Sequence, residues 1–454
     1  MGMRTIIDSI PVFLVALIEN LRSKLQDPGF IARHRVRSQD FSRQRQLTFP
    51  VVMLFILQKT VKSIQRHLNE FLNELAHGEL FESVTPGAWT HARAKLKHTA
   101  FIELNRGSIL PAIYSPERSE TLQRWRGHRL LGVDSSLLRL PNSPDLFEHF
   151  TRVEVSCQIG DTGLHYPQAR LSVIYDLLNR VGLDGRLEPS VVGEVDLAIE
   201  QLRQAAPGDV LINDRGFTGY KYLAWHHRLG LDYIARCSTG SFAAAQELFR
   251  MQRAGRSVIV KLFAPADQKA ELKKLGLPLE LTVRFVSLRL PTGELEVLVT
   301  SLLDESSYPT EEFLQVYHWR WNHETFYKVL KSRLDLENFS GQTAEAIRQD
   351  VHSTVLLCNL ETVISAPAQA SLQQQSAAHL HPKQINHAVA FHTLKDQLLE
   401  LLYSPTPTET VVRHLQELFM GSPVSVRLNR KIPRKKPALG RSYHFQKRVR
   451  KIVF

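Results

Sequence analysis

The spacing of apolar and polar residues divides the chain into a helical first part and a mixed middle part. Over residues 1–125 the apolar positions recur at helical spacing, and we expect helices near 5–25, 48–76 and 87–105. The longest apolar runs, PVFLVALI and FPVVMLFIL, are too short to cross a bilayer and are interpreted as core-facing helices. We therefore expect a helical N-terminal domain over 1–125 and no membrane partner.

From about residue 128 the pattern becomes that of short, buried strands. Strands are predicted for HRLLGVDSSLLRLP, ARLSVIYDLLN, VGLDGRLEPS, DVLINDRG and LDYIARCS, with helices at 194–204 and 218–229. Strand, hairpin, helix, strand, helix and strand in this order predict a mixed α/β sheet over 126–238.

A β-rich segment, 239–309, follows this sheet. FAAAQELFRMQRAG is predicted as a helix and SVIVKLF as a strand, while LTVRFVSLRL and ELEVLVTSLL form a hairpin that turns at Thr292-Gly293. We interpret this segment as an insertion, because the helical pattern that would continue the α/β core resumes only at 310–365.

The last part of the chain, 366–454, is expected to hold a linker, a helical region and a basic tail. A helix is predicted over 343–364, and SAPAQASLQQQSAA (365–378) has the composition of a low-complexity linker. Residues 383–420 have a helical pattern again.

Positive charge is concentrated at the end of the chain. The formal net charge is +12, and residues 427–451 alone hold eleven Lys and Arg with no Asp or Glu. A basic segment with interleaved aromatic residues is typical of contact with a phosphate backbone, although a solubilising tail has the same composition. A second candidate for DNA binding is VTPGAWTHARAKL (84–96), where Thr85 and Pro86 open a basic helix as in a helix-turn-helix. The three cysteines are far apart, which suits a reducing cytoplasm.

The segment YHWRWNHETFYKVLK carries an unusual set of polar residues. At helical spacing Tyr317, Arg320, Glu324 and Lys331 fall within a stripe about 60° wide. A solvated polar face has the same pattern, and the residues alone leave that alternative open. Two further carboxylates draw attention: Asp134 in the middle of a buried strand, where a charge needs compensation, and Asp214 at the carboxyl end of another. Three such acids can hold two divalent metal ions for phosphoryl transfer.

These segments resemble a known family. GVDSS, INDRGFTGY and YHWRWNHETFYKVLK resemble the three acidic boxes of DDE transposases of the bacterial insertion-sequence-four family. The third box matches that family's Y-x2-R-x3-E-x6-K signature at Tyr317, Arg320, Glu324 and Lys331. The intervals also fit, since 214 − 134 = 80 and 324 − 214 = 110, the second being long because the family carries a β-rich insertion there.

The resemblance implies an RNase H-like catalytic core with the β-rich insertion, preceded by the helical domain. It implies a cut-and-paste DNA transposase in which Asp134, Asp214 and Glu324 are catalytic and bind two Mg²⁺ or Mn²⁺ ions. Tyr317, Arg320, Lys331 and Arg215 would contact DNA. The partners would be the terminal inverted repeats of the element and target DNA, with a homodimer pairing the two ends in the bacterial cytoplasm, at the nucleoid.

One departure from the family concerns the insertion. In some relatives a tryptophan of the insertion stacks on a flipped base during hairpin formation, but none of the five tryptophans here falls in 239–309. Four phenylalanines are possible substitutes: Phe242, Phe249, Phe263 and Phe285.

Two other functions are weighed against the transposase. A tyrosine recombinase would use Tyr317 as nucleophile with Arg320 and His323 assisting, but it explains neither Asp134 nor Asp214. A catalytically inactive DNA-binding derivative is the other alternative, and the intact acids count against it.

Overall fold

The computed structural model describes residues 10–43, 45–59, 63–77, 79, 82–154 and 165–426, with the backbone alone at 332 and 333. The basic tail at 427–451 lies outside these residues. The chain forms two compact units that do not follow the predicted domain boundaries. Of the described residues, those within 1–116, 139–167 and 330–454 form the first unit, and those within 117–138 and 168–329 form the second.

The second unit is built on a mixed sheet. Its strands have these bounds: β1 (Leu130–Arg139), β3 (His165–Asp176), β4 (Val181–Pro189), β5 (Val210–Asn213), β6 (Asp232–Arg236), β7 (Arg256–Phe263), β8 (Glu280–Arg289) and β9 (Leu295–Thr300). Within the described residues the sheet has nine strands, the ninth being β2 (Thr151–Glu154) beside the start of β3. Each strand predicted between 128 and 238 is present.

The order of the strands fits an RNase H-like core. β3 pairs with the antiparallel β4 and with β1, and the parallel strands β5 and β6 follow on the other side of β1. The first part of β1, all of β5 and the second half of β3 are buried, as their runs of Val, Leu and Ile require in a sheet covered by helices. The observed fold therefore agrees with a mixed α/β core.

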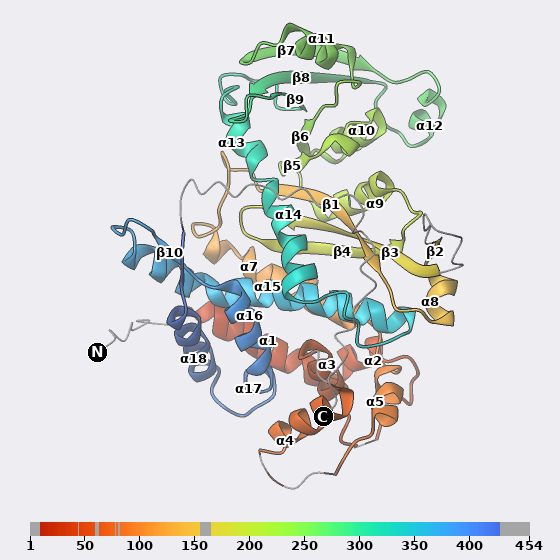
Figure 1. The fold of residues 1–454 in the computed structure, drawn as a ribbon, viewed down its shortest axis with the longest axis vertical. Coiled ribbons are helices and arrows are strands. Elements are labelled where there is room, and N and C mark those ends of the chain that lie inside the picture. Colours follow the sequence, from red (N-terminus) through yellow and green to blue (C-terminus); the bar gives the residue numbers. More distant parts are fainter. Residues whose placement is uncertain are drawn as a thin grey trace, which may run out of the picture. The chain divides into compact units, whose positions relative to one another are not determined.

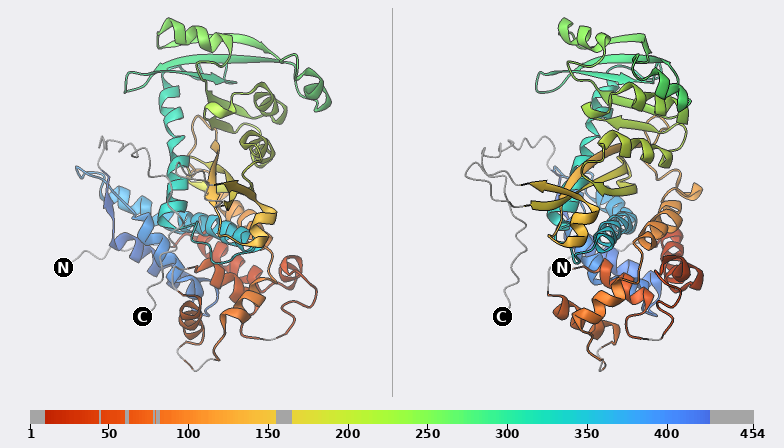
Figure 2. Two further views of the ribbon diagram at one scale, coloured as in Figure 1. Left: turned by 45° about the vertical axis from the view of Figure 1, so that its right-hand side comes forward. Right: turned by 90° about the vertical axis from the view of Figure 1, so that its right-hand side faces the viewer.

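The β-rich segment 239–309 continues this sheet. β9 pairs antiparallel with β6, and β8 and β7 follow it outward to the edge. The β8–β9 hairpin turns where it was predicted, with Gly293 at φ 89°, a conformation that glycine adopts readily. Helix α11 (Ala243–Met251) packs across the three strands (Figure 2). The segment therefore belongs to the same compact unit as β5 and β6.

Helices of the second unit cover the five core strands (Figure 1). They are α9 (Glu194–Gln201), α10 (Tyr220–Leu229), α13 (Glu312–His318) and α14 (Trp321–Lys328), with the short α12 (Lys269–Lys274) beside β8. α10 ends at Gly230, whose φ of 66° closes the helix in the left-handed conformation. α9 and α10 lie where the amphipathic pattern predicted them.

The first unit is helical. Its N-terminal part holds α1 (Val12–Gln26), α2 (Pro28–His34), α3 (Phe49–Leu57), α4 (Ile64–Leu75), α5 (Pro86–Arg93), α6 (Thr99–Leu104) and α7 (Leu110–Ile113). Its later part holds α8 (Pro144–His149), α15 (Ala344–Gln375), α16 (His387–Asp396), α17 (Leu398–Leu402) and α18 (Thr408–Gly421). All nine residues of α3 are buried, which explains its unbroken apolar run.

Helix α15 is the centre of the first unit. It packs against α3, α6, α16 and α18. Among the described helices it is long and apolar enough to cross a membrane, but 67% of its most apolar window is buried inside the protein, as in a core helix. α15 also corrects a prediction, since it runs through 365–375, where a linker was expected. Pro367 lies inside it, and Ala368 and Leu372 are buried, so packing holds this polar segment helical.

The predicted basic recognition helix at 84–96 is also corrected. Thr85 does cap α5, accepting a hydrogen bond from the Ala88 backbone N–H at 3.2 Å. However, the helix ends at Arg93, and Arg93 is only 4% exposed, with its guanidinium donating to Gln349 and Asp350 of α15 at 2.7 and 2.8 Å. Arg93 therefore connects α5 to α15 and is too buried to contact a DNA backbone.

Candidate active site

The sheet register brings the first two predicted acids together. β1 and β5 run parallel, with Gly132 opposite Ile212. Asp134 and Asp214 each lie two residues further along, Asp134 within β1 and Asp214 directly after β5, so they stand at the same level on neighbouring strands. Neighbouring strands lie about 4.8 Å apart. The two acids therefore lie side by side where β5 ends, and the carboxyl end of a parallel strand is a place where α/β proteins bind ligands.

Helix α14 brings the third acid to the same place. A Cβ at Gly132 would lie 3.1 Å from Nδ1 of His323, so the helix approaches β1 closely enough to require glycine there. Asp134, two residues on, faces the same side of the sheet. The Tyr327 hydroxyl donates to the backbone carbonyl of Asp134 at 2.7 Å, which fixes α14 against β1. Glu324 is in the first turn of this helix.

Arg320 and Tyr317 link the second and third acids. Arg320 Nη2 lies 2.7 Å from Glu324 Oε1, and Nη1 lies 4.0 Å from Asp214 Oδ2. The Tyr317 hydroxyl donates to Asp214 Oδ1 at 3.4 Å. Tyr317 and Arg320 are each only 7% exposed. Tyr317 and Arg320 therefore face the acids and are not part of a solvated surface.

The single helix predicted for 317–331 is interrupted. α13 ends at His318 and α14 begins at Trp321, with tighter i→i−3 hydrogen bonds from Asn322 and His323 back to Trp319 and Arg320. Beyond α14 the chain forms a π-helical turn, Val329–Arg333. Lys331 lies on this turn and belongs to the first unit, whereas Tyr317, Arg320 and Glu324 belong to the second.

Asp134 is held in a costly charge state. Its pKa is raised from 3.8 to about 6, mainly by burial and also by the carboxylates of Glu194 and Glu324. The Ser135 backbone N–H, which donates to Asp134 Oδ1 at 2.8 Å, and the charge of Arg320 act in the opposite direction. Above pH 6 the site therefore carries an ionised carboxylate that would gain from a bound cation.

The same environment keeps the aromatic neighbours uncharged. Burial raises the pKa of the Tyr317 hydroxyl well above its usual value. Burial and then Arg320 lower the pKa of His323 to about 3, and the imidazole stacks between the rings of Tyr175 and Tyr327. A neutral, buried histidine and a protonated tyrosine bonded to a carboxylate do not suit a tyrosine recombinase.

Arg215 and several residues that the sequence analysis missed surround these groups. The backbone N–H of Arg215 donates to Asp214 Oδ1 at 2.8 Å, and its side chain is exposed. Glu194 accepts a hydrogen bond at 2.6 Å from Ser135 Oγ, which also accepts one from Arg170 at 2.8 Å. Nothing in the local sequence marks Glu194, because its proximity to Asp134 depends on α9 packing beside β1.

The donor set suits a hard divalent cation. Carboxylate oxygens are the ligands that Mg²⁺ and Mn²⁺ prefer, and two of these carboxylates already face one cationic group, the Arg320 guanidinium. As they stand, no three His, Cys, Asp or Glu side chains among the described residues are grouped closely enough to hold a metal ion. The chemistry of the residues fits metal ions, and small side-chain movements are needed to receive them.

The phenylalanines of the β-rich segment differ in exposure. Phe285 is fully buried and packs against Phe242 with 5.7 Å between ring centroids, while Phe249 is half-buried. Phe263, on the edge strand β7, is 66% exposed. Of the four, Phe263 has the ring that is free to stack on a base.

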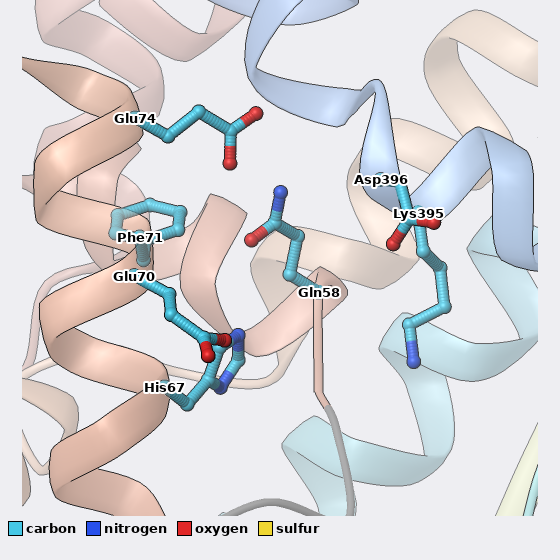
Figure 3. A pocket seen from close by; sticks show the side chains of 7 residues that line it. All are labelled: Gln58, His67, Glu70, Phe71, Glu74, Lys395 and Asp396. Atoms are coloured by element: carbon cyan, nitrogen blue, oxygen red, sulfur yellow. The ribbon is translucent and has the colours of Figure 1, made fainter. Parts of the chain in front are cut away.

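A cavity in the first unit is of a different kind. It has a volume of about 240 Å³ and is lined by Gln58, His67, Glu70, Phe71, Glu74, Lys395 and Asp396 (Figure 3). Figure 3 shows the Gln58 amide turned toward the Glu74 carboxylate and the Lys395 amine pointing away from both. Carboxylates predominate in this lining, so the cavity does not suit a nucleic-acid phosphate.

The fold and the acids define a class of protein: a DDE transposase. The chain belongs to the family whose model is described as the transposase DDE domain, which matches residues 125–360. It is similar to the transposase InsG for insertion sequence element IS4 of Escherichia coli strain K12, with 25% identity over 243 residues. That alignment covers 52% of this chain and 52% of the relative, so the two correspond over about half their lengths.

A solved structure was also matched, a cryo-EM structure of the piggyBac transposase synaptic complex with hairpin DNA. The match covers 96% of this chain and 87% of that one, with 11% identity and a TM-score of 0.42. The family resemblance inferred from the acidic boxes is confirmed by the family model and the IS4 relative.

Proposed function

We propose that this protein moves an insertion sequence by cut-and-paste transposition, cleaving DNA at the terminal inverted repeats and joining the freed 3′ ends to a target. The observation that carries the proposal is the convergence of the predicted acids. Asp134 and Asp214 lie level with each other on the neighbouring strands β1 and β5, and Arg320 lies between Asp214 and Glu324.

In this proposal Asp134, Asp214 and Glu324 hold two Mg²⁺ or Mn²⁺ ions. When bound, such ions stabilise the charge that develops on the attacking and leaving oxygens of a phosphoryl transfer. The protein supplies a rigid frame for them. β1 and β5 fix the two aspartates, and the Tyr327 hydroxyl bonded to the Asp134 carbonyl keeps α14, and with it Glu324, against the sheet.

The cationic side chains would position the scissile strand. Arg320 and the exposed Arg215 lie beside the acids, where a phosphate would approach them, and a buried guanidinium binds phosphate strongly. Tyr317 keeps its proton and can donate it in a hydrogen bond to a phosphate oxygen. Lys331 is proposed to contact the same DNA strand, because it matches the lysine of the family signature. A homodimer acting in the bacterial cytoplasm, at the nucleoid, would bring two transposon ends together.

The test is cleavage of the DNA that flanks the protein's own coding region, with Mg²⁺, resolving nicks, hairpins and double-strand breaks. We expect cleavage at the 3′ ends of the element that is abolished in Asp134→Ala, Asp214→Ala and Glu324→Ala, with DNA binding retained. Glu247→Ala, which removes an exposed carboxylate on α11, is the matched control and should cleave normally.

Three results would contradict the proposal. Undiminished cleavage by any of the three alanine variants would remove that acid from the mechanism. Specific binding without cleavage by the unmutated protein, in Mg²⁺ and in Mn²⁺, would identify an inactive DNA-binding derivative. A covalent adduct between Tyr317 and DNA would indicate a recombinase.

A further inference from the structure

The Arg320 side chain occupies the space that separates two of the three acids. Its two terminal nitrogens point to different carboxylates, Nη2 to Glu324 at 2.7 Å and Nη1 to Asp214 at 4.0 Å. One guanidinium therefore compensates the charge of two of the three acids.

This position leaves Arg320 incompletely bonded. The side chain is 9% exposed, and in the described part of the chain its Nε has no hydrogen-bond partner. The guanidinium carbon lies 5.7 Å from the Tyr317 ring and 5.4 Å from the Trp321 ring. Trp321 is 39% exposed, so the ring offers a second cation–π surface closer to solvent.

A divalent cation and this guanidinium compete for the same oxygens. Glu324 Oε1 accepts from Arg320, so a metal ion bound there would stand a few ångströms from a second positive charge, and like charges at that distance repel strongly in a partly buried site. The grouping of acids is too open to hold a metal ion as it stands. Arg320 has to leave before the acids can close around one.

We propose that Arg320 is an internal counter-ion of the metal-free site, displaced when a divalent cation binds and then available to a DNA phosphate. The proposal rests on the proposed function, because it takes these acids as the metal ligands. It deepens that function by coupling two steps. Metal binding releases Arg320, which can then bind a DNA phosphate. By thermodynamic linkage, DNA that binds Arg320 increases the affinity of the acids for the metal ion.

The test measures Mn²⁺ binding to the full-length protein without DNA, by calorimetry and by the electron paramagnetic resonance of free Mn²⁺. We expect Arg320→Gln to bind Mn²⁺ on the order of tenfold more tightly than the unmutated protein. Arg215→Gln is the matched control, since it removes the same charge beside Asp214 from an exposed side chain. Its Mn²⁺ affinity should change by less than about twofold, as expected for a screened charge.

A second readout uses the unmutated protein and does not depend on the folding of a variant at Arg320. Adding Ca²⁺ without DNA should change the fluorescence of Trp321 as the guanidinium leaves its ring, and the change should be absent in Trp321→Phe. If Arg320→Gln binds Mn²⁺ no more tightly than the unmutated protein, or Ca²⁺ leaves Trp321 unchanged, the counter-ion role is wrong.

Asp214→Asn separates this inference from the proposed function. If the unmutated protein binds Mn²⁺ and Asp214→Asn does not, the metal site stands, and an unchanged affinity in Arg320→Gln overturns only the counter-ion role. If Mn²⁺ binding is unaffected by Asp214→Asn, the proposed metal site itself is wrong.

Discussion

Substitution of Asp134 tests whether its ionised carboxylate destabilises the folded protein when no metal ion is bound. Its carboxylate lies in the middle of β1 near Glu194 and Glu324, with Arg320 as the compensating charge. Asp134→Asn removes the negative charge but keeps an oxygen that can accept the Ser135 N–H. We therefore expect this variant to be inactive and, without metal, more stable than the unmutated protein.

The magnitude follows from the pKa of Asp134. The pKa is 3.8 in the unfolded chain and about 6 in the folded protein, a difference of about 2.2. Each pKa unit corresponds to about 1.4 kcal/mol, so the ionised carboxylate destabilises the folded state by about 3 kcal/mol. Because the raised pKa makes the folded state bind the proton more tightly, the carboxyl is protonated in both states below pH 4 and this cost is absent there. The cost appears, and the folded protein loses stability, as the pH rises through about 6.

The assay is urea unfolding in EDTA between pH 4 and pH 8, followed by far-ultraviolet circular dichroism. We expect Asp134→Asn to gain stability over the unmutated protein as the pH rises from 4 to 6, reaching about 1–3 kcal/mol and then levelling off. Adding Mg²⁺ should stabilise the unmutated protein and leave Asp134→Asn nearly unchanged.

The reasoning is refuted if Asp134→Asn is less stable than the unmutated protein at pH 7.5. It is also refuted if the difference between the two does not depend on pH, because the gain would then not come from the titration of this carboxylate.

Three further predictions concern other parts of the molecule. Tyr327→Phe removes the hydroxyl that donates to the Asp134 carbonyl, so it should raise the Mg²⁺ concentration needed for half-maximal cleavage and lower the free energy of unfolding in urea by about 1–2 kcal/mol. Tyr220→Phe is the control, because its hydroxyl donates to the Pro278 carbonyl, and it should leave the Mg²⁺ requirement unchanged. Asp350→Ala leaves buried cationic partners uncompensated and should cost about 3–5 kcal/mol in the same assay; a loss below about 1 kcal/mol would contradict this. Phe263→Ser should change stability by less than about 0.5 kcal/mol, and gel analysis of the cleavage products should show less hairpin DNA; an unchanged hairpin yield would exclude this ring as the stacking residue.

Much of the second unit could be predicted from the sequence. Short runs of Val, Leu and Ile between turn residues marked β1 and β3 to β6, and the Thr292-Gly293 turn marked the last hairpin. These are local signals, since strand burial and turn chemistry depend on neighbouring residues. Asp134 and Asp214 drew attention by their places on predicted strands, and the family motifs grouped them with Glu324 as the predicted catalytic acids.

The features that were missed depend on contacts between distant segments. Arg93 has the sequence context of an exposed helical residue, and only the packing of α15 makes it a buried partner of Asp350. The helix through 365–375 is polar in composition and exists because Ala368 and Leu372 are buried against other helices. The placement of Arg320 between two acids likewise could not be deduced, because helical spacing gives a direction and no distance.

The discontinuous first unit has a consequence for synthesis on the ribosome. Its early helices, including the wholly apolar α3, pack on α15, which begins at residue 344. Every strand of the second unit, in contrast, is complete by residue 300. The nascent chain therefore exposes the apolar surface of α3 until most of the polypeptide has emerged. A chain cut short before residue 344 would keep that surface uncovered and is expected to aggregate or to need a chaperone.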